Sequence, residues 1–442
     1  MKNYWLLYIS LYLCRKFCYM RKFFISFIGL VMLWSCDKKD DPEPTPEPTV
    51  YDRTVLVYMS GENDLTKGSD NFMATDLKEM DEGSYQLNDN QHLIVFIDSI
   101  GKNNPPHIVE IANGQRKLLY QYDSDFPASD PGKFSEVVKW TIEHYPSKDY
   151  GLVLWGHASG WIVENDSVAN RLNTRAYGYD YGYDTEDGRK SMNITQMAKA
   201  LNDIPKLKYI FADCCSFMCV ENAYELKDAA DYLIGSPAEI PGEGAPYQTI
   251  IPALFSNSGT FYKDICDIYY DYYLDAYKTS EYILFGLEGY SVPLSVIDLS
   301  KMELLAQATN SLLATIAPAI TQPAELDLSN LPFYFSSSSS TGFKIMYDMA
   351  TVFHQYTSNS DYSQWLSVFN QTVPYSLASR KWQTMYTPIL NSFDFFPIDE
   401  GLYGNVSMFF PQQSYDKSTY KFNSRIKNFQ WYYRMNWSNY GW

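Results

Sequence analysis

The chain lacks a cysteine framework. It has 442 residues and 7 cysteines, four of which lie in the main body of the chain at Cys214, Cys215, Cys219 and Cys266. Three of the four fall within six positions, so an evenly spaced disulfide scaffold is excluded. No second Cys/His pair with ligand spacing lies near them, and two adjacent cysteines are poorly placed to bind one ion, so we expect no zinc site and no other resident metal.

Positive charge is also scarce. The chain has 35 Lys and Arg residues against 52 Asp and Glu residues, which gives a formal net charge of −17 at pH 7. This balance argues against nucleic acid and against an anionic membrane surface as partners. Internal repeats are absent as well, so a solenoid is not expected.

The N-terminus has the pattern of a targeting segment. A positive start at Met20-Arg21-Lys22 precedes an apolar stretch, residues 23–33, which is too short for an ordinary membrane span. Residues 33–36 (LWSC) resemble a bacterial lipobox, in which Cys36 becomes the lipidated first residue. We therefore expect residues 1–36 to be a signal segment with its true start at Met20; the alternative is an uncleaved signal anchor.

A spacer follows this segment. Residues 37–50 combine acidic residues with alternating prolines, a composition typical of an extended, semi-rigid linker. The acidic residues after Cys36 resemble surface-export signals of Bacteroidota lipoproteins. The expected location is the bacterial outer membrane or cell surface, with a lipid anchor holding an extracytoplasmic domain.

The main body alternates predicted strands and helices. Apolar, β-rich runs at residues 53–59, 92–97, 150–156, 208–213 and 231–234 are separated by helical patterns at residues 72–80, 134–142, 194–201 and 220–227. This alternation predicts a mostly parallel sheet flanked by helices. We place the core at residues 51–257 and a helix-rich C-terminal extension, packed on the core, at residues 258–442. Helices are expected at 262–277, 302–316 and 421–435, and strands at 291–297 and 406–410.

Two of the apolar runs end in reactive side chains. His157 follows residues 150–156, and Cys215 follows residues 208–213 after one further cysteine. Ligands bind at the carboxyl ends of strands in open α/β sheets, and a His and a Cys delivered there can form a nucleophile and its base. A lone Cys is more often inert core, but a core histidine would lie inside the strand and not in a loop flanked by glycines.

Four segments together resemble the clostripain-related cysteine peptidases, which have a caspase-like α/β fold. They are an opening strand and turn, a catalytic-histidine motif, a nucleophile motif with its helix, and a pocket-forming loop: residues 54–65 (TVLVYMSGENDL), 155–161 (WGHASGW), 213–226 (DCCSFMCVENAYEL) and 236–247 (SPAEIPGEGAPY). The resemblance covers about residues 53–250 and is weak beyond them.

The resemblance implies peptide-bond hydrolysis through an acyl-enzyme. Cys215 would be the nucleophile and His157 its base, with the backbone N–H groups of Ala158 and Cys215 as oxyanion donors. A helix N-terminus after Cys215 would lower the thiol pKa. No third residue that orients His157 can be identified from the sequence.

Specificity and processing follow from the same resemblance. Asp213 shares a strand face with Cys215 because side chains alternate along a strand, and with Glu243 it would bind Arg or Lys on the acyl side of the scissile bond. The alternatives are a strand-end cap for Asp213 and a solvated loop charge for Glu243. Self-cleavage is expected in the long polar loop at residues 162–190, after Arg171, Arg175 or Lys190.

Three positions depart from the family pattern. Ala158 replaces the usual Gly, Cys214 replaces the usual Ala before the nucleophile, and Glu243 replaces an Asp. Spacing to Glu221 aligns Cys215, and not Cys214, with the nucleophile. No cofactor is implied, and a calcium requirement is left open. The competing hypothesis is a non-catalytic surface lipoprotein that binds peptide or glycan on a peptidase-like fold, which the 39 Tyr and 10 Trp residues would suit.

Overall fold

The computed structural model describes residues 50–68, 71–101, 104–162, 176–180, 190–278, 289–336, 342–379, 381–384, 393–395, 403–417 and 421–442. Its centre is a nine-stranded sheet in the order β11-β8-β7-β6-β5-β1-β2-β3-β4. The strands are β1 (Tyr51–Gly61), β2 (Gln91–Ser99), β3 (His107–Ala112), β4 (Gln115–Gln121), β5 (Ser147–Gly156), β6 (Leu207–Asp213), β7 (Ala230–Gly235), β8 (Leu294–Asp298) and β11 (Tyr375–Leu377).

The five central strands β2, β1, β5, β6 and β7 run parallel to one another. The outer strands β3, β4, β8 and β11 pair antiparallel with their neighbours. The predicted mostly parallel α/β sheet is therefore confirmed. Parallel neighbours bring their carboxyl ends to one edge of the sheet, and this arrangement positions the candidate site.

Alternating residues of each central strand enter two separate hydrophobic layers. Tyr209 and Phe211 of β6 lie in one layer, and Ile210 and Ala212 lie in the other. Because both faces are covered, the strands are apolar throughout and not only at every second position. The first layer is covered by α2 (Phe72–Ser84), α6 (Tyr247–Leu254) and α7 (Phe261–Ala276).

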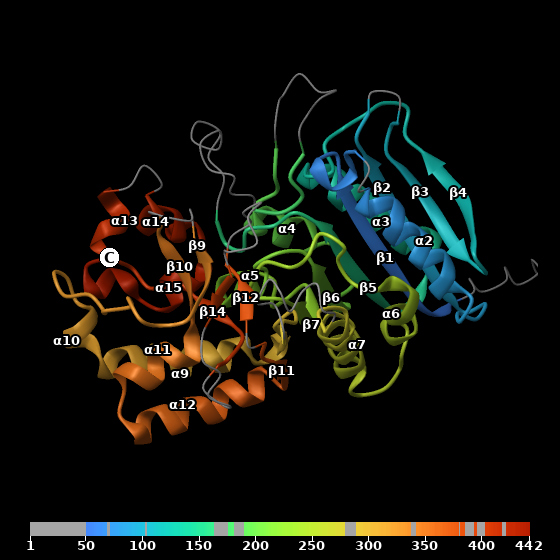
Figure 1. The fold of residues 1–442 in the computed structure, drawn as a ribbon. Coiled ribbons are helices and arrows are strands. Elements are labelled where there is room, and N and C mark those ends of the chain that lie inside the picture. Colours follow the sequence, from blue (N-terminus) through green and yellow to red (C-terminus); the bar gives the residue numbers. More distant parts are fainter. Residues whose placement is uncertain are drawn as a thin grey trace, which may run out of the picture. The chain divides into compact units, whose positions relative to one another are not determined.

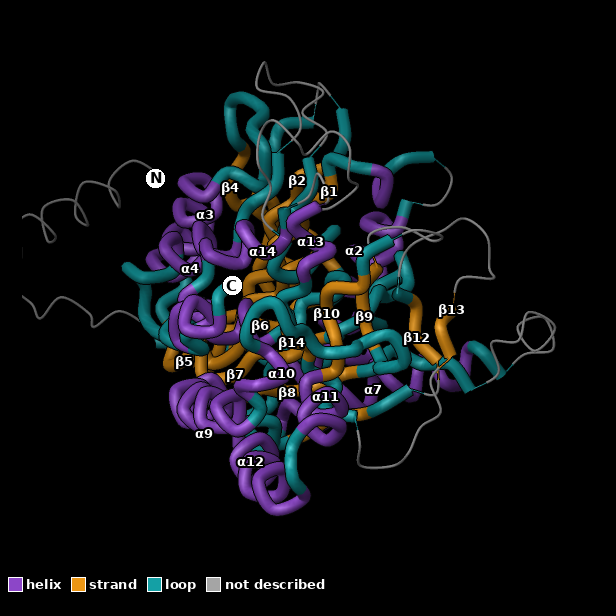
Figure 2. Tube along the Cα trace, turned by 90° about the vertical axis from the view of Figure 1, so that its left-hand side faces the viewer, coloured by secondary structure: helices purple, strands orange, loops and turns teal. Residues whose placement is uncertain are grey.

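The opposite layer is covered by α3 (Pro131–His144), α4 (Ile194–Ala200), α5 (Val220–Glu225) and α9 (Met302–Thr315). Figure 2 shows the strands between α3, α4 and α9 on one side and α7 on the other. Asn71 caps α2 by accepting from Ala74 N, and Asp130 caps α3 by accepting from Gly132 N and Lys133 N. These are the residue types that satisfy the unpaired N–H groups of a first helical turn.

The part of the chain after α9 adds two smaller sheets, β14-β10-β9 and β12-β13, and further helices. Its elements are α10 (Ala317–Ile320), β9 (Phe333–Ser336), β10 (Lys344–Asp348), α11 (Met349–Tyr356), α12 (Asn359–Thr372), β12 (Lys381–Gln383), β13 (Phe393–Phe395), β14 (Ser407–Met408), α13 (Gln413–Lys417), α14 (Phe422–Arg425) and α15 (Gln430–Arg434). Short 3-10 turns occur at Asp64–Thr66 (η1), Leu299–Lys301, Ile426–Asn428 and Trp437–Tyr440. In Figure 1 the segments coloured orange to red gather on the side of the large sheet away from β3 and β4.

One predicted element is wrong. The continuous closing helix expected at residues 421–435 is instead two short helices, α14 and α15, separated by a 3-10 turn. Phe429 has extended backbone angles (φ −101°, ψ 141°), which no helix can pass through. The predicted strand at 406–410 is shortened to β14. Among the described residues, no helix is long and apolar enough to cross a membrane.

Candidate functional site

Two neighbouring strands deliver the predicted dyad to one edge of the sheet. β5 and β6 pair in parallel, and their register places Trp155 opposite Asp213. His157 and Cys215 each follow one of these partners by two residues. The predicted base and nucleophile therefore leave adjacent strands at the same level, at the carboxyl edge where α/β proteins bind ligands.

Gly156 allows the chain to turn between β5 and His157. Its φ is +139°, and a Cβ built on it would lie 2.8 Å from the carbonyl oxygen of Ser60. Any other residue would meet the backbone of β1 and would also be strained. The backbone conformation and the close approach of β1 at the end of β5 thus require glycine before the histidine.

A carboxylate that the sequence analysis missed contacts His157. Nε2 of His157 lies 2.9 Å from Oδ1 of Asp64, which is in η1 just after β1. Asn63 accepts from Leu65 N and donates to the carbonyl oxygen of Tyr179, so the turn that carries Asp64 is itself held in place. Asp64 was part of the recognised turn motif, but spacing along the chain could not reveal that it faces a histidine 93 positions away.

Cys215 lies just beyond β6 and is partly exposed. Its neighbour Ser216 has a φ of +54°, so the chain turns sharply directly after the thiol. The backbone N–H of Ile240 donates to Sγ of Cys215 at 3.4 Å. Burial and the Glu239 carboxylate together raise the pKa of the Cys215 thiol well above its usual value.

The expected help from a helix N-terminus is wrong for this thiol. α5 begins at Val220, five residues after Cys215, and it is only six residues long. The pKa of the thiol is raised and not lowered, so α5 does not give the expected net stabilisation of the thiolate. In the absence of substrate the thiol is therefore the stable form of Cys215, and its activation depends on a base.

Cys214 lies in a different environment from Cys215. It is fully buried in the layer that contains Ile210 and Ala212, on the face of the sheet opposite Asp213. The alternation expected at the end of β6 thus separates the two thiols, and Cys215 is the one with access to solvent.

Asp213 has three hydrogen-bond donors. Oδ2 accepts from the hydroxyl of Tyr247 at 2.8 Å and from Ala245 N at 3.1 Å, and Oδ1 accepts from the hydroxyl of Tyr269 at 2.9 Å. The side chain is buried, with 3% exposed. Burial raises the pKa of Asp213, and the three donors act in the opposite direction because they stabilise the ionised form.

The loop between β7 and α6 wraps over Asp213. Gly244 has a φ of +64°, and a Cβ there would lie 2.8 Å from Oδ2 of Asp213. The hydroxyl of Tyr273 donates to the carbonyl oxygen of Gly244 at 2.7 Å and holds the loop on α7. Glu243, the predicted second pocket residue, lies on this loop with its side chain exposed.

Two further acids on α2 belong to the same region, and sequence analysis missed both. Asp76 is fully buried and accepts from Nε1 of Trp155 at 2.5 Å. Glu79 accepts from Tyr247 N at 3.0 Å. Burial raises the pKa of Asp76 to about 9, and Asp213 adds to this effect; burial also raises the pKa of Glu79 to about 7. Their spacing resembled an ordinary helix surface, and only the packing of α2 on the sheet brings them to Asp213.

Of the other predicted oxyanion, processing and lipidation positions, the structure describes Ala158 and Lys190. Ala158 does not have a positive φ, so the replacement of glycine leaves an ordinary backbone N–H at this position. Lys190 forms an antiparallel backbone bridge with Asp180. Arg171, Arg175 and Cys36 lie outside the described residues. No group of three or more His, Cys, Asp or Glu side chains in the described ranges is arranged to hold a metal ion.

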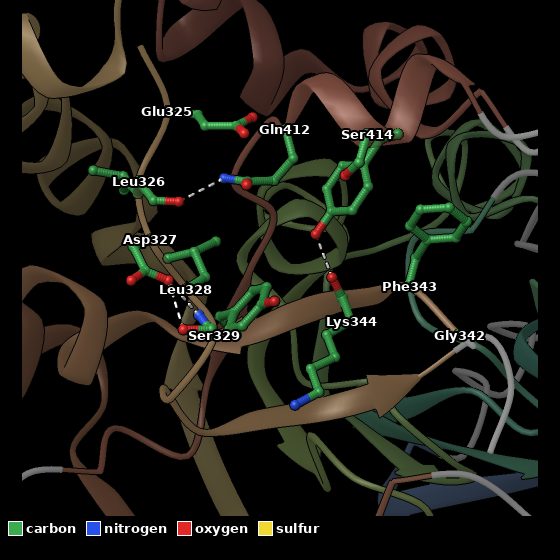
Figure 3. A pocket seen from close by; sticks show the side chains of 12 residues that line it. Glu325, Leu326, Asp327, Leu328, Ser329, Gly342, Phe343, Lys344, Gln412 and Ser414 are labelled. Carbon is green, nitrogen blue, oxygen red and sulfur yellow. Dashed lines mark hydrogen bonds between the residues drawn. The ribbon is translucent and has the colours of Figure 1, made fainter. Parts of the chain in front are cut away.

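A separate cavity of about 500 Å³ lies in the C-terminal part (Figure 3) and contains none of these residues. Its polar groups pair with one another: Asp327 accepts from Ser329, and Gln412 donates to the carbonyl oxygen of Leu326. The cavity is therefore separate from the proposed dyad and from the Asp213 region.

The comparisons with known proteins agree with this geometry. The model of the clostripain family matches residues 57–442. A secreted C11 cysteine protease from Bacteroides thetaiotaomicron, solved with an irreversible peptide inhibitor, is 26% identical over 88% of this chain and 99% of its own, with a TM-score of 0.71. An inactive zymogen C11 protease from Parabacteroides distasonis has the same fold, with 22% identity over 88% and 99% of the two chains and a TM-score of 0.68.

No match was found among curated proteins. The family model nevertheless extends over most of the chain, from β1 to the last residue, and includes both strand ends that carry the candidate dyad. The chain therefore belongs to the clostripain family and is a cysteine peptidase with a caspase-like fold.

Proposed function

We propose that this peptidase is an endopeptidase that cleaves after Arg or Lys, with Cys215 as nucleophile and His157 as base. One observation carries the proposal: the strand ends that present His157 and Cys215 adjoin a buried acid, Asp213, which three donors hold in place. A carboxylate fixed beside a nucleophile is suited to bind a guanidinium or ammonium group.

The proposed reaction begins with proton transfer. Since the pKa of the Cys215 thiol is raised, His157 removes the thiol proton as Sγ attacks the peptide carbonyl carbon. Asp64 contacts Nε2, so Nδ1 is the nitrogen that takes this proton. The N–H groups of Ala158 and Cys215 are the proposed donors to the oxyanion. As the C–N bond breaks, His157 protonates the leaving amine, and water then hydrolyses the thioester.

Active-site labelling tests the dyad. A peptide electrophile that alkylates thiols should modify Cys215, and Cys215→Ala should abolish labelling and turnover; loss of a nucleophile costs ~10⁶-fold in a studied serine enzyme. His157→Ala should lower turnover by a similar factor because the two residues act as a unit. Cys214→Ala is the matched control and should keep most of the activity. An inactive Cys214→Ala together with an active Cys215→Ala would show that Cys214, and not Cys215, is the nucleophile.

A substrate panel tests specificity. Fluorogenic peptides that differ only at the residue before the scissile bond should be cleaved best with Arg or Lys there. Asp213→Asn should lower kcat/KM for these substrates by about 30-fold or more, since losing one partner of a buried charge pair costs about 2–5 kcal/mol. Best cleavage after Asp, Asn or an apolar residue would refute the basic pocket and leave the dyad intact.

Self-processing is a further part of the proposal. Arg171 and Arg175 are favoured over Lys190, because the backbone of Lys190 is bridged to Asp180 and protease cleavage needs an accessible, unpaired strand. The wild-type chain should appear as two fragments on a denaturing gel, and Cys215→Ala should appear as one. Full activity in an uncleaved wild-type chain would remove processing from the mechanism.

The proposed location is extracytoplasmic, with a lipid on Cys36. The support is the lipobox pattern at residues 33–36 and the fact that the similar B. thetaiotaomicron protease is secreted. Cys36→Ser should release the protein from the membrane fraction without changing the activity of the folded domain. A wild-type protein that begins at Met1 and lacks lipid would contradict this proposal.

A further inference from the structure

Asp76 lies beside the pocket proposed above, behind Asp213. Trp155 and Asp213 are opposite each other in the β5–β6 ladder, and the indole Nε1 of Trp155 donates to Oδ2 of Asp76. Tyr247 makes a second connection between α2 and the pocket, because its N–H donates to Glu79 and its hydroxyl donates to Asp213. Asp76 is therefore hydrogen-bonded to the cross-strand neighbour of Asp213, and the two carboxyl groups act on each other electrostatically.

Within the part of the chain that the structure describes, only one of the two oxygens of the Asp76 carboxyl group has a hydrogen-bond donor. Its side chain is fully buried, and Oδ1 has no hydrogen-bond partner among the described residues. A buried polar atom without a partner costs free energy, and such atoms in native structures are associated with function. This orphaned oxygen distinguishes Asp76 from Asp213, whose two oxygens share three donors.

Among the described residues, the charged groups that act on Asp76 are all acids. They are Glu79 on its own helix, Asp213 at the end of β6 and Glu243 on the loop before α6. Tyr247 of α6 and Tyr272 of α7 also interact with it. On the other elements packed against α2, Asp64 of η1 pairs with His157, and Glu110 of β3 pairs with His92.

We propose that Asp76 is a specificity-determining residue that becomes ionised when a basic substrate side chain enters the pocket beside Asp213. In the empty enzyme the acid is neutral, which limits repulsion among the clustered carboxyl groups. An arriving guanidinium or ammonium group stabilises the carboxylate form, and the proton of Asp76 passes to the solvent. A neutral side chain gains nothing from this acid and binds without proton release.

This inference rests on the proposed basic specificity and adds a pH-dependent contribution to it. The three donors to Asp213 favour its charged form, whereas Asp76 has one donor and supplies its charge only with the correct substrate. Discrimination against a neutral side chain then comes partly from a linked proton, so it depends on pH. Because the pKa of Asp76 is raised to about 9, the effect extends over neutral and mildly alkaline pH and fades as pH rises through that value.

Proton release on binding tests the inference. The Cys215→Ala protein is titrated calorimetrically at pH 8 with two blocked peptides that differ only in arginine or its uncharged isostere citrulline. The titrations are repeated in phosphate and in Tris, whose ionisation enthalpies differ, so that the difference in heat reports the protons released. At pH 8 Glu79, whose pKa is about 7, is already largely ionised, so a proton released there that Asp76→Asn removes belongs to Asp76.

The arginine peptide should release a substantial fraction of one proton, and the citrulline peptide should release none. The additional change Asp76→Asn keeps an acceptor for Trp155 and should abolish the release. In the Cys215-containing enzyme, Asp76→Asn should reduce the ratio of kcat/KM for arginine over citrulline by about tenfold or more, mainly through KM. Glu82→Gln, on the same helix and 57% exposed, is the matched control and should change neither measurement.

Two results separate the inference from the proposed function. If the arginine peptide binds more tightly than the citrulline peptide but releases no proton, Asp76 has no such role and the basic pocket stands. If the two peptides bind equally, the basic pocket itself is wrong. The first measurement uses the unaltered Asp76, so an absence of proton release refutes the inference even if Asp76→Asn does not fold.

Discussion

At the scale of single residues, Asp213 carries more hydrogen bonds than a strand-end cap requires. A cap uses its carboxylate to satisfy the backbone next to it, but two of the three donors to Asp213 are tyrosine hydroxyls from α6 and α7. These side chains bury the carboxylate and also favour its charged form. A buried carboxylate costs free energy in the empty protein, and under the proposed basic specificity a bound cation would offset this cost.

The hydroxyl of Tyr269 should be needed to keep Asp213 charged. Tyr269→Phe leaves Oδ1 of Asp213 without its donor, which should cost about 1–3 kcal/mol of folding stability. The pKa of Asp213 should rise further, so kcat/KM for arginine substrates should fall more than for citrulline substrates at neutral pH. Chemical denaturation and the paired substrates measure the two effects.

Tyr262→Phe is the control, since this tyrosine is on the same helix and its ring packs against Tyr232 and Phe261. An equal loss for arginine and citrulline substrates in Tyr269→Phe would indicate a purely structural role for the hydroxyl.

The sequence predicted only part of this network. Asp213 could be found because it lies two residues before Cys215 on a strand, where side chains alternate. Tyr269 belongs to a helix with five tyrosines in residues 261–276, and helical periodicity does not say which of them faces a carboxylate. Asp76 and Asp64 reach the site through tertiary packing from positions far away in the chain, so no local pattern marks them.

At the scale of elements, the buried parallel strands were predicted best. β1, β2, β5, β6 and β7 are apolar runs bounded by turn residues, and such runs are distinctive. The C-terminal part was predicted less well. β9, β10 and β14 are two to five residues long and take their form from pairing with one another, so local sequence does not specify them. The prediction of one closing helix also failed, because aromatic residues that pack against the core override helical periodicity there.

The short turn η1 should orient His157, the proposed base, through Asp64. Asp64→Asn retains an oxygen acceptor but loses the charge that stabilises the protonated imidazole during acyl transfer. Because Asp64 is 50% exposed, we expect only a modest fall in kcat, of roughly tenfold, with little change in KM. Steady-state kinetics on one arginine substrate measure both parameters.

Asp52→Asn is the matched control. Asp52 is an acid in β1 that pairs with Lys148, and it lies at the other end of the strand. If Asp64→Asn altered KM alone, Asp64 would contact the substrate and would not orient the base.

At the scale of the whole molecule, the C-terminal part is hydrogen-bonded to the segment that follows Cys215, the proposed nucleophile. The carbonyl oxygen of Met218 accepts from Ser407 N, and the buried carboxylate of Glu221 accepts from Phe409 N at 2.8 Å. Glu225 accepts from the backbone and side chain of Gln430. The chain just after Cys215 is therefore held by residues almost 200 positions away, and the position of the thiol depends on the folding of the C-terminal part.

Buried acids make the folded molecule sensitive to alkaline pH. Burial raises the pKa of Asp76 to about 9 and those of Glu79 and Glu221 to about 7. An acid whose pKa is higher in the folded state binds more protons when folded, so its stabilising contribution is complete below its unfolded pKa of about 4 and is lost as pH rises through the folded value. Glu303, whose pKa the hydrogen bond from Arg434 lowers to about 2, titrates below this window.

We therefore expect the free energy of unfolding to fall between pH 5 and pH 9, with each raised acid contributing a slope of up to about 1.4 kcal/mol per pH unit. Denaturant titrations of the inactive Cys215→Ala protein avoid self-cleavage and measure this slope. Asp76→Asn should flatten it up to about pH 9, and Glu221→Gln should flatten it only up to about pH 7, because the two acids titrate over different ranges. A slope unchanged by Asp76→Asn would mean that this acid is already ionised in the empty enzyme, and the proton released on binding arginine would then have to come from another group.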